Sequence, residues 1–305
     1  MVAFIDDHRD AYGVEPICAQ LPIAPSTYRA HKAQQADPSR RSARVQHDEE
    51  LKREVQRVWD DNFCVYGARK VWRQLTREGI PTARCTVERL MRGLGCRGAT
   101  RGRAFTITTQ RAPEPALPAD LVRREFTAPR PNALWVADFT YVATWNGFVY
   151  TAFVIDVFSR YIVGWRVATT MQASLVLDAL EQAVHARPDR AGLIHHSDHG
   201  SQYLSLRYSE RLTAAGLVPS VGTVGDSYDN AMAESVIGLY KTEVIRRQGP
   251  WRHVDAVEMA TLTWVDWFNR RRLLEPLGHV PPHEYEQAFY TRQGTPALHI
   301  QAGLN

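Results

Sequence analysis

Residues 134–167 read LWVADFTYVATWNGFVYTAFVIDVFSRYIVGWRV, and this stretch decides the fold. Apolar, β-branched and aromatic residues dominate 134–142, 148–158 and 161–167, as is typical of strands. The Asn146-Gly147 pair between the first two segments is typical of a two-residue hairpin turn. We therefore predict three consecutive antiparallel strands, with a domain boundary near residue 130, where the β pattern begins.

Helices and single strands alternate after these three strands. The predicted elements are a helix at 173–186, a strand at 192–197, a helix at 208–215, a strand at 217–221 and a long helix at 230–247. The resulting order, βββαβαβα, is that of the ribonuclease-H-like fold, although the order alone also fits other α/β proteins.

The chain divides into five predicted segments. They are a short helical unit with a linker (1–45), a helix-turn-helix region (46–98), a basic proline-containing linker (99–130), the ribonuclease-H-like core (131–246) and a helical C-terminal extension (247–305). In the extension, Trp264, Trp267 and Phe268 are expected to pack inward.

Basic residues concentrate in the first third of the chain. Residues 1–111 hold 20 Lys and Arg against 13 Asp and Glu, while the whole 305-residue chain has a net charge of only +4. Within 63–111 the count is 11 to 2, which creates a field that attracts phosphate backbone. We predict DNA binding here, with a solvated helical surface as the alternative. The candidate DNA contacts are Arg69, Lys70, Arg73, Arg84, Arg89, Arg92, Arg101 and Arg103.

Composition excludes several classes of protein. With 44% hydrophobic and 23% charged residues, the chain can form buried cores and is not disordered throughout. Its four cysteines form no C-x-x-C pair, which argues against a zinc ribbon or a disulfide framework. No apolar run approaches the roughly 20 residues of a membrane helix, and the charged first ten residues do not resemble a signal peptide. We expect a soluble, cytoplasmic protein.

Three acidic residues lie where packing gives no evident reason for a charge. Asp138 interrupts the apolar first strand, Asp198 closes the fourth strand and Glu234 lies on the last helix. A carboxylate inside a buried strand must be paired or bind a cation. Each acid alone has an ordinary alternative: a strand end, a turn before Gly200 or a solvated helix position. Together they predict a catalytic site in which all three bind divalent metal.

The predicted metal follows from the donor atoms. Hard oxygen ligands suit Mg²⁺, with Mn²⁺ as a substitute, and two such ions support in-line phosphoryl transfer. On the last helix, Lys241 follows Glu234 at a spacing that places both on one side. Lys241 can then meet a DNA phosphate near the metals.

Other polar residues near the three acids receive lesser roles. A two-residue turn at Asn146-Gly147 would place Asp138 opposite Ile155 and turn Asp156 to the other face of the sheet, so Asp156 is left out of the site. The histidines around Asp198 lack the spacing typical of zinc ligands. Supporting positions are assigned to His196, Gln202 and Asn230.

Four motifs carry a resemblance to a known family: WVADFTY at 135–141, IDVFSR at 155–160, HSDxGSQY at 196–203 and YDNAxAES at 228–235. They resemble the OrfB, or downstream-frame, transposases of the IS-three family of bacterial insertion sequences, members of the retroviral-integrase superfamily with its DDE catalytic core. The 35 residues between Asp198 and Glu234 match the superfamily's D-35-E interval, and Lys241 falls seven residues after the glutamate. The similarity also covers residues 66–94, upstream of these motifs, and residues 267–282, downstream of them.

The resemblance implies a specific activity: cleavage at the element's ends and joining of the freed 3′-hydroxyl to DNA, by a copy-out, paste-in route. The three acids would bind the metals. The implied partners are the terminal inverted repeats, target DNA, further copies of the chain and the upstream-frame product OrfA, as a partner or a frameshift fusion. We expect the chain to be the downstream product, associated with the bacterial nucleoid. Two positions depart from the common pattern, His199 and Leu274.

Two other functions remain open at the level of sequence. A structure-selective nuclease of the same fold would need the three acids but no specific DNA ends. A catalytically idle DNA-binding regulator would use only the basic segment.

Overall fold

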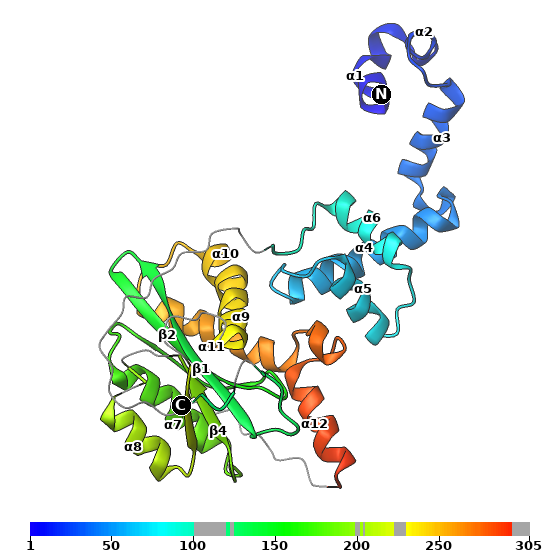
Figure 1. Ribbon diagram of the computed structural model, residues 1–305. Helices are drawn as coiled ribbons and strands as arrows, with labels where there is room; N and C mark the ends of the chain where they lie inside the picture. The colour runs from blue at the N-terminus through cyan, green and yellow to red at the C-terminus, as the bar shows by residue number, and fades with distance from the viewer. Residues whose placement is uncertain (101–119, 123–124, 199–201, 204, 223–229, 295–305) are drawn as a thin grey trace.

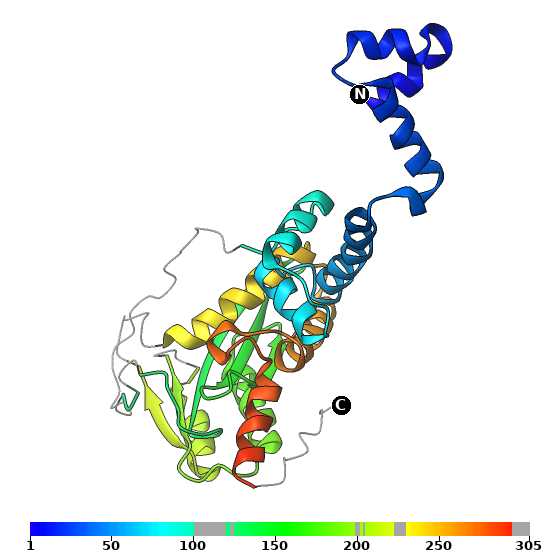
Figure 2. The same ribbon diagram turned by 90° about the vertical axis from the view of Figure 1, so that its right-hand side faces the viewer.

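The computed structural model describes residues 1–100, 120–122, 125–198, 202–203, 205–222 and 230–294, and Figure 1 shows their arrangement. At the N-terminus, three helices form a small unit that projects away from the remainder in Figures 1 and 2. They are α1 (Val2–Tyr12), α2 (Val14–Gln20) and α3 (Pro25–Ala36). Ile5, Ile17, Cys18 and Tyr28 form the unit's own small core. After a 3₁₀ turn, η1 (Pro38–Arg40), the chain enters the next helix.

The region predicted to be helix-turn-helix consists of α4 (Ala43–Asp61), α5 (Ala68–Arg77) and α6 (Arg84–Leu94). The three helices pack around fully buried apolar residues, among them Val55, Leu75 and Leu90. Helix α6 ends at Gly95, whose φ of 74° is the left-handed conformation that glycine adopts most readily. The predicted helices are confirmed here.

Five strands form one mixed sheet in the order β3-β2-β1-β4-β5. The strands are β1 (Leu134–Thr144), β2 (Gly147–Asp156), β3 (Ile162–Ala168), β4 (Ile194–Ser197) and β5 (Val218–Val221). β1, β2 and β3 are antiparallel neighbours, as predicted, whereas β4 runs parallel to β1 and to β5. This mixed topology, with helices in the predicted order, is that of the ribonuclease-H-like fold.

The predicted register of the first hairpin was wrong by two residues. Gly147 pairs with Thr144, so the turn is at 145–146, and Asp138 lies opposite Phe153 instead of Ile155. A shift of two residues keeps each side chain on its face, because side chains alternate with a period of two. Asp156 therefore still faces away from the side of Asp138, as predicted.

Helices cover both faces of the sheet. Helices α7 (Ala173–Ala186) and α8 (Leu206–Ala214) pack on the face that carries Trp135 and Val154. Gly164 of β3 allows a close approach there, because a Cβ at this position would collide with the carbonyl oxygen of Ala179 in α7. Helices α9 (Ala231–Tyr240) and α11 (Val254–Arg270) cover the face of Phe153.

The predicted long helix at 230–247 is interrupted. After α9 the chain forms a π-helical turn, η3 (Lys241–Ile245), and then the short α10 (Arg246–Gln248). Downstream of α11 lie η4 (Glu275–Leu277) and α12 (Pro282–Arg292). Trp264, Trp267 and Phe268 are at most 3% exposed, which confirms that they pack inward. None of the helices in the described residues is long and apolar enough to cross a membrane.

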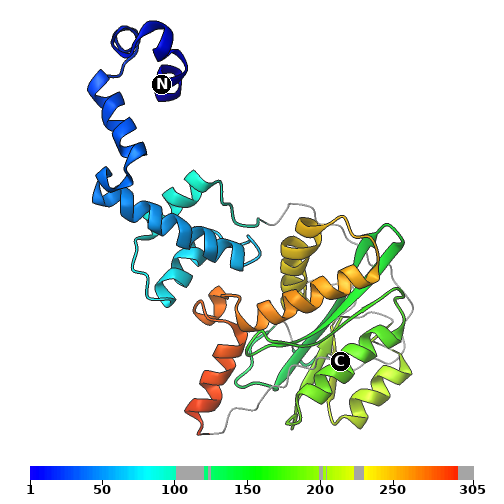
Figure 3. The same cartoon turned by 180° about the vertical axis from the view of Figure 1, so that it is seen from behind.

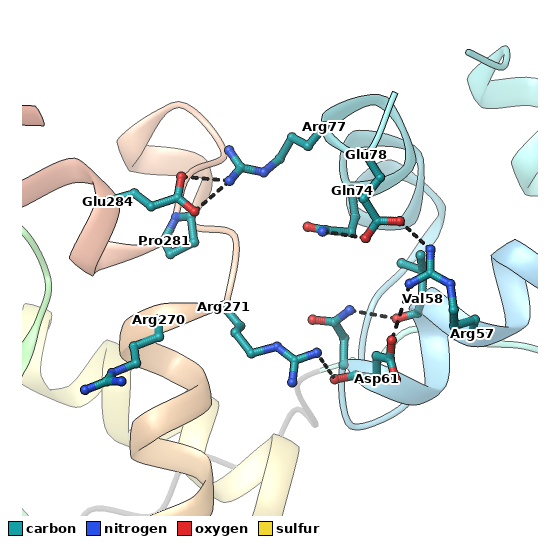
Figure 4. A pocket seen from close by; sticks show the side chains of 11 residues that line it. Arg57, Val58, Asp61, Gln74, Arg77, Glu78, Arg270, Arg271, Pro281 and Glu284 are labelled. Atoms are coloured by element: carbon teal, nitrogen blue, oxygen red, sulfur yellow. Dashed lines mark hydrogen bonds and ion pairs between the residues drawn. The ribbon is translucent and has the colours of Figure 1, made fainter. Parts of the chain in front are cut away.

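The α4–α6 region docks onto the C-terminal elements. Asn62 accepts a 3.0 Å hydrogen bond from Trp267 Nε1, and the hydroxyl of Tyr66 accepts one of 2.8 Å from the backbone N–H of Leu273. Figure 4 shows an open pocket of about 140 Å³ at this junction, with Arg77 on one side paired to Glu284 on the other. The helical region and the C-terminal elements thus share one hydrophobic core.

Candidate active site

Asp138 and Asp198 lie side by side where the pairing of the parallel strands β1 and β4 ends. The parallel pairing of β1 and β4 runs from Leu134 to Ala137, where Ala137 is opposite Ser197. Asp138 and Asp198 are the next residues on their strands, and both are half-buried. The backbone N–H of Phe139 donates a 2.8 Å hydrogen bond to Asp138 Oδ1. The strand pairing therefore brings together two acids that are 60 positions apart in the sequence.

Helix α9 carries Glu234 toward the same place. Asn230 precedes the helix, and its Nδ2 donates a 3.0 Å hydrogen bond to the carbonyl oxygen of Ala137, the residue before Asp138. Apolar residues of α9, including Ala233, pack against β1, while Glu234 in the first turn is exposed. The start of the helix is thereby fixed beside the strand that carries the first acid.

The three carboxylates perturb one another. Burial, and then the charges of Asp198 and Glu234, hold the pKa of Asp138 well above its ordinary value. Burial and the charge of Asp198 also raise the pKa of Glu234. Ionised carboxylates in such an arrangement repel, and a bound cation would offset that repulsion. In the described part of the chain, however, no group of three or more His, Cys, Asp or Glu side chains is drawn together closely enough to hold a metal ion.

Lys241 supplies positive charge beside the acids. Burial lowers the pKa of Lys241, and the charge of Asp138 acts in the opposite direction. Its Nζ lies 5.5 Å from the centre of the Tyr141 ring, three residues beyond Asp138 on β1. Lys241 thus lies near both Asp138 and Tyr141 of β1.

Tyr203 is a residue of the site that the sequence reasoning missed. It is 3% exposed, and its hydroxyl finds no hydrogen-bond partner among the described residues. Burial and the charges of Asp138 and Asp198 raise the pKa of Tyr203, so its hydroxyl stays protonated near both acids. Its place in the HSDxGSQY motif that contains Asp198 is the sequence signal that points to it. The Gln202 side chain donates to the carbonyl of Met171 at 3.3 Å.

The histidines next to Asp198 have structural contacts. His196 is buried, with Nδ1 2.9 Å from Ser220 Oγ on β5. On the other face, burial lowers the pKa of His195 to about 3, and its Nε2 lies 3.1 Å from the hydroxyl of Tyr208. Both are thus held within the sheet layers, whereas His199 lies outside the described residues.

Asp156 stabilises a turn. It accepts hydrogen bonds from the backbone N–H groups of Asn132 at 2.7 Å and Ser159 at 2.9 Å. Burial, and then the charge of Glu286, raise its pKa to about 6. These bonds tie the chain before β1 to the turn between β2 and β3.

Two of the three predicted DNA contacts on α5, Arg69 and Lys70, contact residues outside the helix. Arg69 forms a 2.8 Å ion pair with Glu275, and Lys70 lies over the Tyr66 ring, where burial lowers its pKa to about 7. Arg73 is exposed but its guanidinium stacks on Trp72.

The three predicted DNA contacts on α6 differ in their surroundings. Arg84 is exposed, while Arg89 pairs with Asp48 at 2.8 Å and Arg92 with Glu88 at 3.5 Å. Arg89 is thus held by an acid of α4 and Arg92 by an acid of its own helix. Arg101 and Arg103 lie outside the described residues.

Comparisons with known proteins agree with this architecture. Residues 46–104 match the family model "HTH-like domain", and residues 128–227 and 215–282 match two models of the "Integrase core domain". The transposase of insertion element IS629 from Shigella sonnei is 57% identical over 298 residues, which cover 98% of this chain and 99% of the relative. The chain belongs to the insertion-sequence transposases.

Further relatives of the transposase extend the comparison. The putative transposase of IS986/IS6110 from Mycobacterium tuberculosis is also 57% identical, over 91% of this chain and 99% of its own length. Among solved structures, the magnesium complex of the HTLV-2 integrase catalytic core domain is 17% identical, with a TM-score of 0.40 over 52% of this chain and 98% of that one. The transposase resembles the OrfB proteins of the IS-three family and is a DDE-type polynucleotidyl transferase that cleaves and joins DNA strands.

Proposed function

We propose that Asp138, Asp198 and Glu234 are the catalytic carboxylates of the transposase and hold two Mg²⁺ ions, for which Mn²⁺ can substitute. The observation that carries the proposal is the juxtaposition of Asp138 and Asp198 where the pairing of β1 with β4 ends, with α9 fixed beside them by Asn230. Carboxylate oxygens are the ligands these ions prefer, and the raised pKa of Asp138 is the expected property of an acid placed where a cation belongs. The bound ions would supply Lewis-acid chemistry for phosphoryl transfer.

The chain's own residues provide position and charge. Asn230 anchors the start of α9, which carries Glu234, to β1 next to Asp138. Lys241 can neutralise a DNA phosphate beside Asp138. The protonated hydroxyl of Tyr203 can donate a hydrogen bond to one of the carboxylates. His196 supports the site by linking β4, which precedes Asp198, to Ser220 on β5.

The proposed substrates are the terminal inverted repeats of the element and a target DNA, processed by the copy-out, paste-in route. Helix α6, with the exposed Arg84, is the face of the helical region best placed to meet phosphates. We propose further that the transposase works as a homo-oligomer on DNA, with OrfA as a partner or as part of a frameshift fusion, and is associated with the nucleoid. The five segments proposed from the sequence remain the working division of the chain.

A strand-transfer assay tests this function. Asp198→Asn should abolish joining of a labelled element end to target DNA in Mg²⁺. The matched control is Asp178→Asn, which removes an exposed acid on α7 and should leave joining unchanged. Full activity of Asp198→Asn would contradict the proposed site. Cleavage that does not depend on the inverted repeat would identify a nuclease instead of a transposase.

A further inference from the structure

A group of exposed aromatic side chains lies at the tip of the β1–β2 hairpin. Tyr141, Trp145 and Phe148 are 47%, 67% and 56% exposed. Strand register pairs Tyr141 with Tyr150 and Phe148 with Ala143, so Tyr141 and Phe148 share one face, with ring centroids 5.3 Å apart. Single exposed apolar residues are ordinary, but a group of three large rings marks an interaction surface.

Cations lie against two of these rings. The Nζ of Lys241 is 5.5 Å from the centre of the Tyr141 ring. The guanidinium carbon of Arg252 is likewise 5.5 Å from the centre of the Trp145 ring. The tip therefore combines flat apolar faces with positive charge.

The two segments that meet at the tip carry mainly positive charge. Segment 241–252 carries four basic residues and a single acid, Glu243, which is buried and paired with Arg272. The hairpin segment 141–150 contains no acidic residue. Such a surface is complementary to a polyanion rather than to an ordinary protein surface.

The tip lies further along the strand that carries Asp138. The backbone N–H of Trp145 donates a 3.0 Å hydrogen bond to the carbonyl of Trp251, and Figure 3 shows the chain between α10 and α11 reaching the hairpin tip. The pairing of β4 along β1 ends at Ala137, and the strand continues outward from Asp138. At about 3.3 Å per residue, Tyr141 lies roughly 10 Å and Trp145 roughly 23 Å from Asp138 along the strand.

We propose that Tyr141, Trp145 and Phe148 form a stacking platform for unpaired bases of the DNA strand that leaves the active site, with Lys241 and Arg252 on its phosphates. Base faces are hidden in a duplex and exposed in a frayed or single-stranded end, and aromatic side chains stack on them with little sequence preference. The inference rests on the proposed function, because the strand is the one processed by the carboxylates.

The test measures binding of the full chain in EDTA, so that no cleavage occurs. Two DNA probes are compared by fluorescence anisotropy: a fully paired duplex and the same duplex with a short unpaired end that contains 2-aminopurine. Trp145→Ala should weaken binding of the frayed probe about fivefold or more, with little effect on the paired one. It should also restore 2-aminopurine fluorescence, which stacking quenches.

Two variants serve as controls. Trp145→Phe retains an aromatic face and should keep most of the preference for the frayed probe. Met259→Ala removes a 63% exposed apolar side chain of α11 and should change nothing. Arg252→Gln should weaken both probes and reduce the salt dependence of binding by about one unit of slope, whereas Trp145→Ala should leave that slope unchanged.

Equal affinity of Trp145→Ala and the wild type for the frayed probe would overturn the platform. A change of oligomeric state in Trp145→Ala without a change in DNA affinity would overturn it too, by assigning the rings to a protein contact. The proposed function is judged separately by the strand-transfer assay. Retention of the preference for the frayed probe in Trp145→Ala, with Mg²⁺-dependent joining by the wild type intact, refutes the platform alone, and absence of joining by the wild type refutes the function.

Discussion

Replacing Asp198 by Asn should inactivate the transposase and, at the same time, stabilise it in the absence of metal. Asp138 and Glu234 have raised pKa values in the folded chain, and Asp198 contributes to both shifts. Folding therefore favours their protonated forms. This contribution to stability is present below about pH 4, where the unfolded acids are protonated, and is lost as the pH rises through the raised folded-state pKa values. At neutral pH the ionised cluster lowers the free energy of unfolding.

The size of the effect follows from the strand geometry. Neighbouring strands lie roughly 5 Å apart, and two unit charges at that separation repel by about 3 kcal/mol at an effective dielectric constant of about 20. Asp138 and Asp198 are both half-buried, so solvent screening reduces the repulsion to about 1 kcal/mol. A gain of that size corresponds to a rise in melting temperature of about 2–4 °C.

Thermal denaturation in EDTA, followed by circular dichroism, measures this gain. The difference between Asp198→Asn and the wild type should appear at pH 7 and shrink below about pH 4. Adding Mg²⁺ should stabilise the wild type and not the variant, because binding to the folded state alone raises stability. Asp178→Asn again serves as the matched control. A variant that is less stable than the wild type in EDTA, or that gains equally from Mg²⁺, would refute the reasoning.

Three further predictions concern other parts of the molecule. Glu286→Gln should lower the free energy of unfolding by about 3 kcal/mol in chemical denaturation, because Arg187, 1% exposed, would lose its buried charge partner. Arg84→Ala should weaken DNA binding in a salt titration and reduce the salt dependence of the affinity by about one unit of slope. Arg69→Ala should change neither quantity, because the guanidinium of Arg69 is already paired with Glu275. Tyr203→Phe should leave thermal stability nearly unchanged, since its hydroxyl has no partner among the described residues, but weaken Mg²⁺ binding about tenfold by calorimetry.

The sequence alone determined the type of fold and the three candidate acids. Alternating and apolar segments predict strands because a half-buried sheet requires that pattern, and the interval between Asp198 and Glu234 is a property of the chain itself. The exclusion of Asp156 survived a wrong hairpin turn, because an even shift in register keeps every side chain on its face.

Only the tertiary structure decided which charged side chains already contact other groups of the protein. Arg69 and Lys70 look like DNA contacts in a basic segment, yet Arg69 meets Glu275 and Lys70 lies over Tyr66. Periodicity also missed the π turn that begins at Lys241. The Arg69–Glu275 pair joins segments 206 residues apart, and local composition does not encode such packing. Local patterns specify which face of an element is buried, but the partner on that face is chosen by the assembled fold.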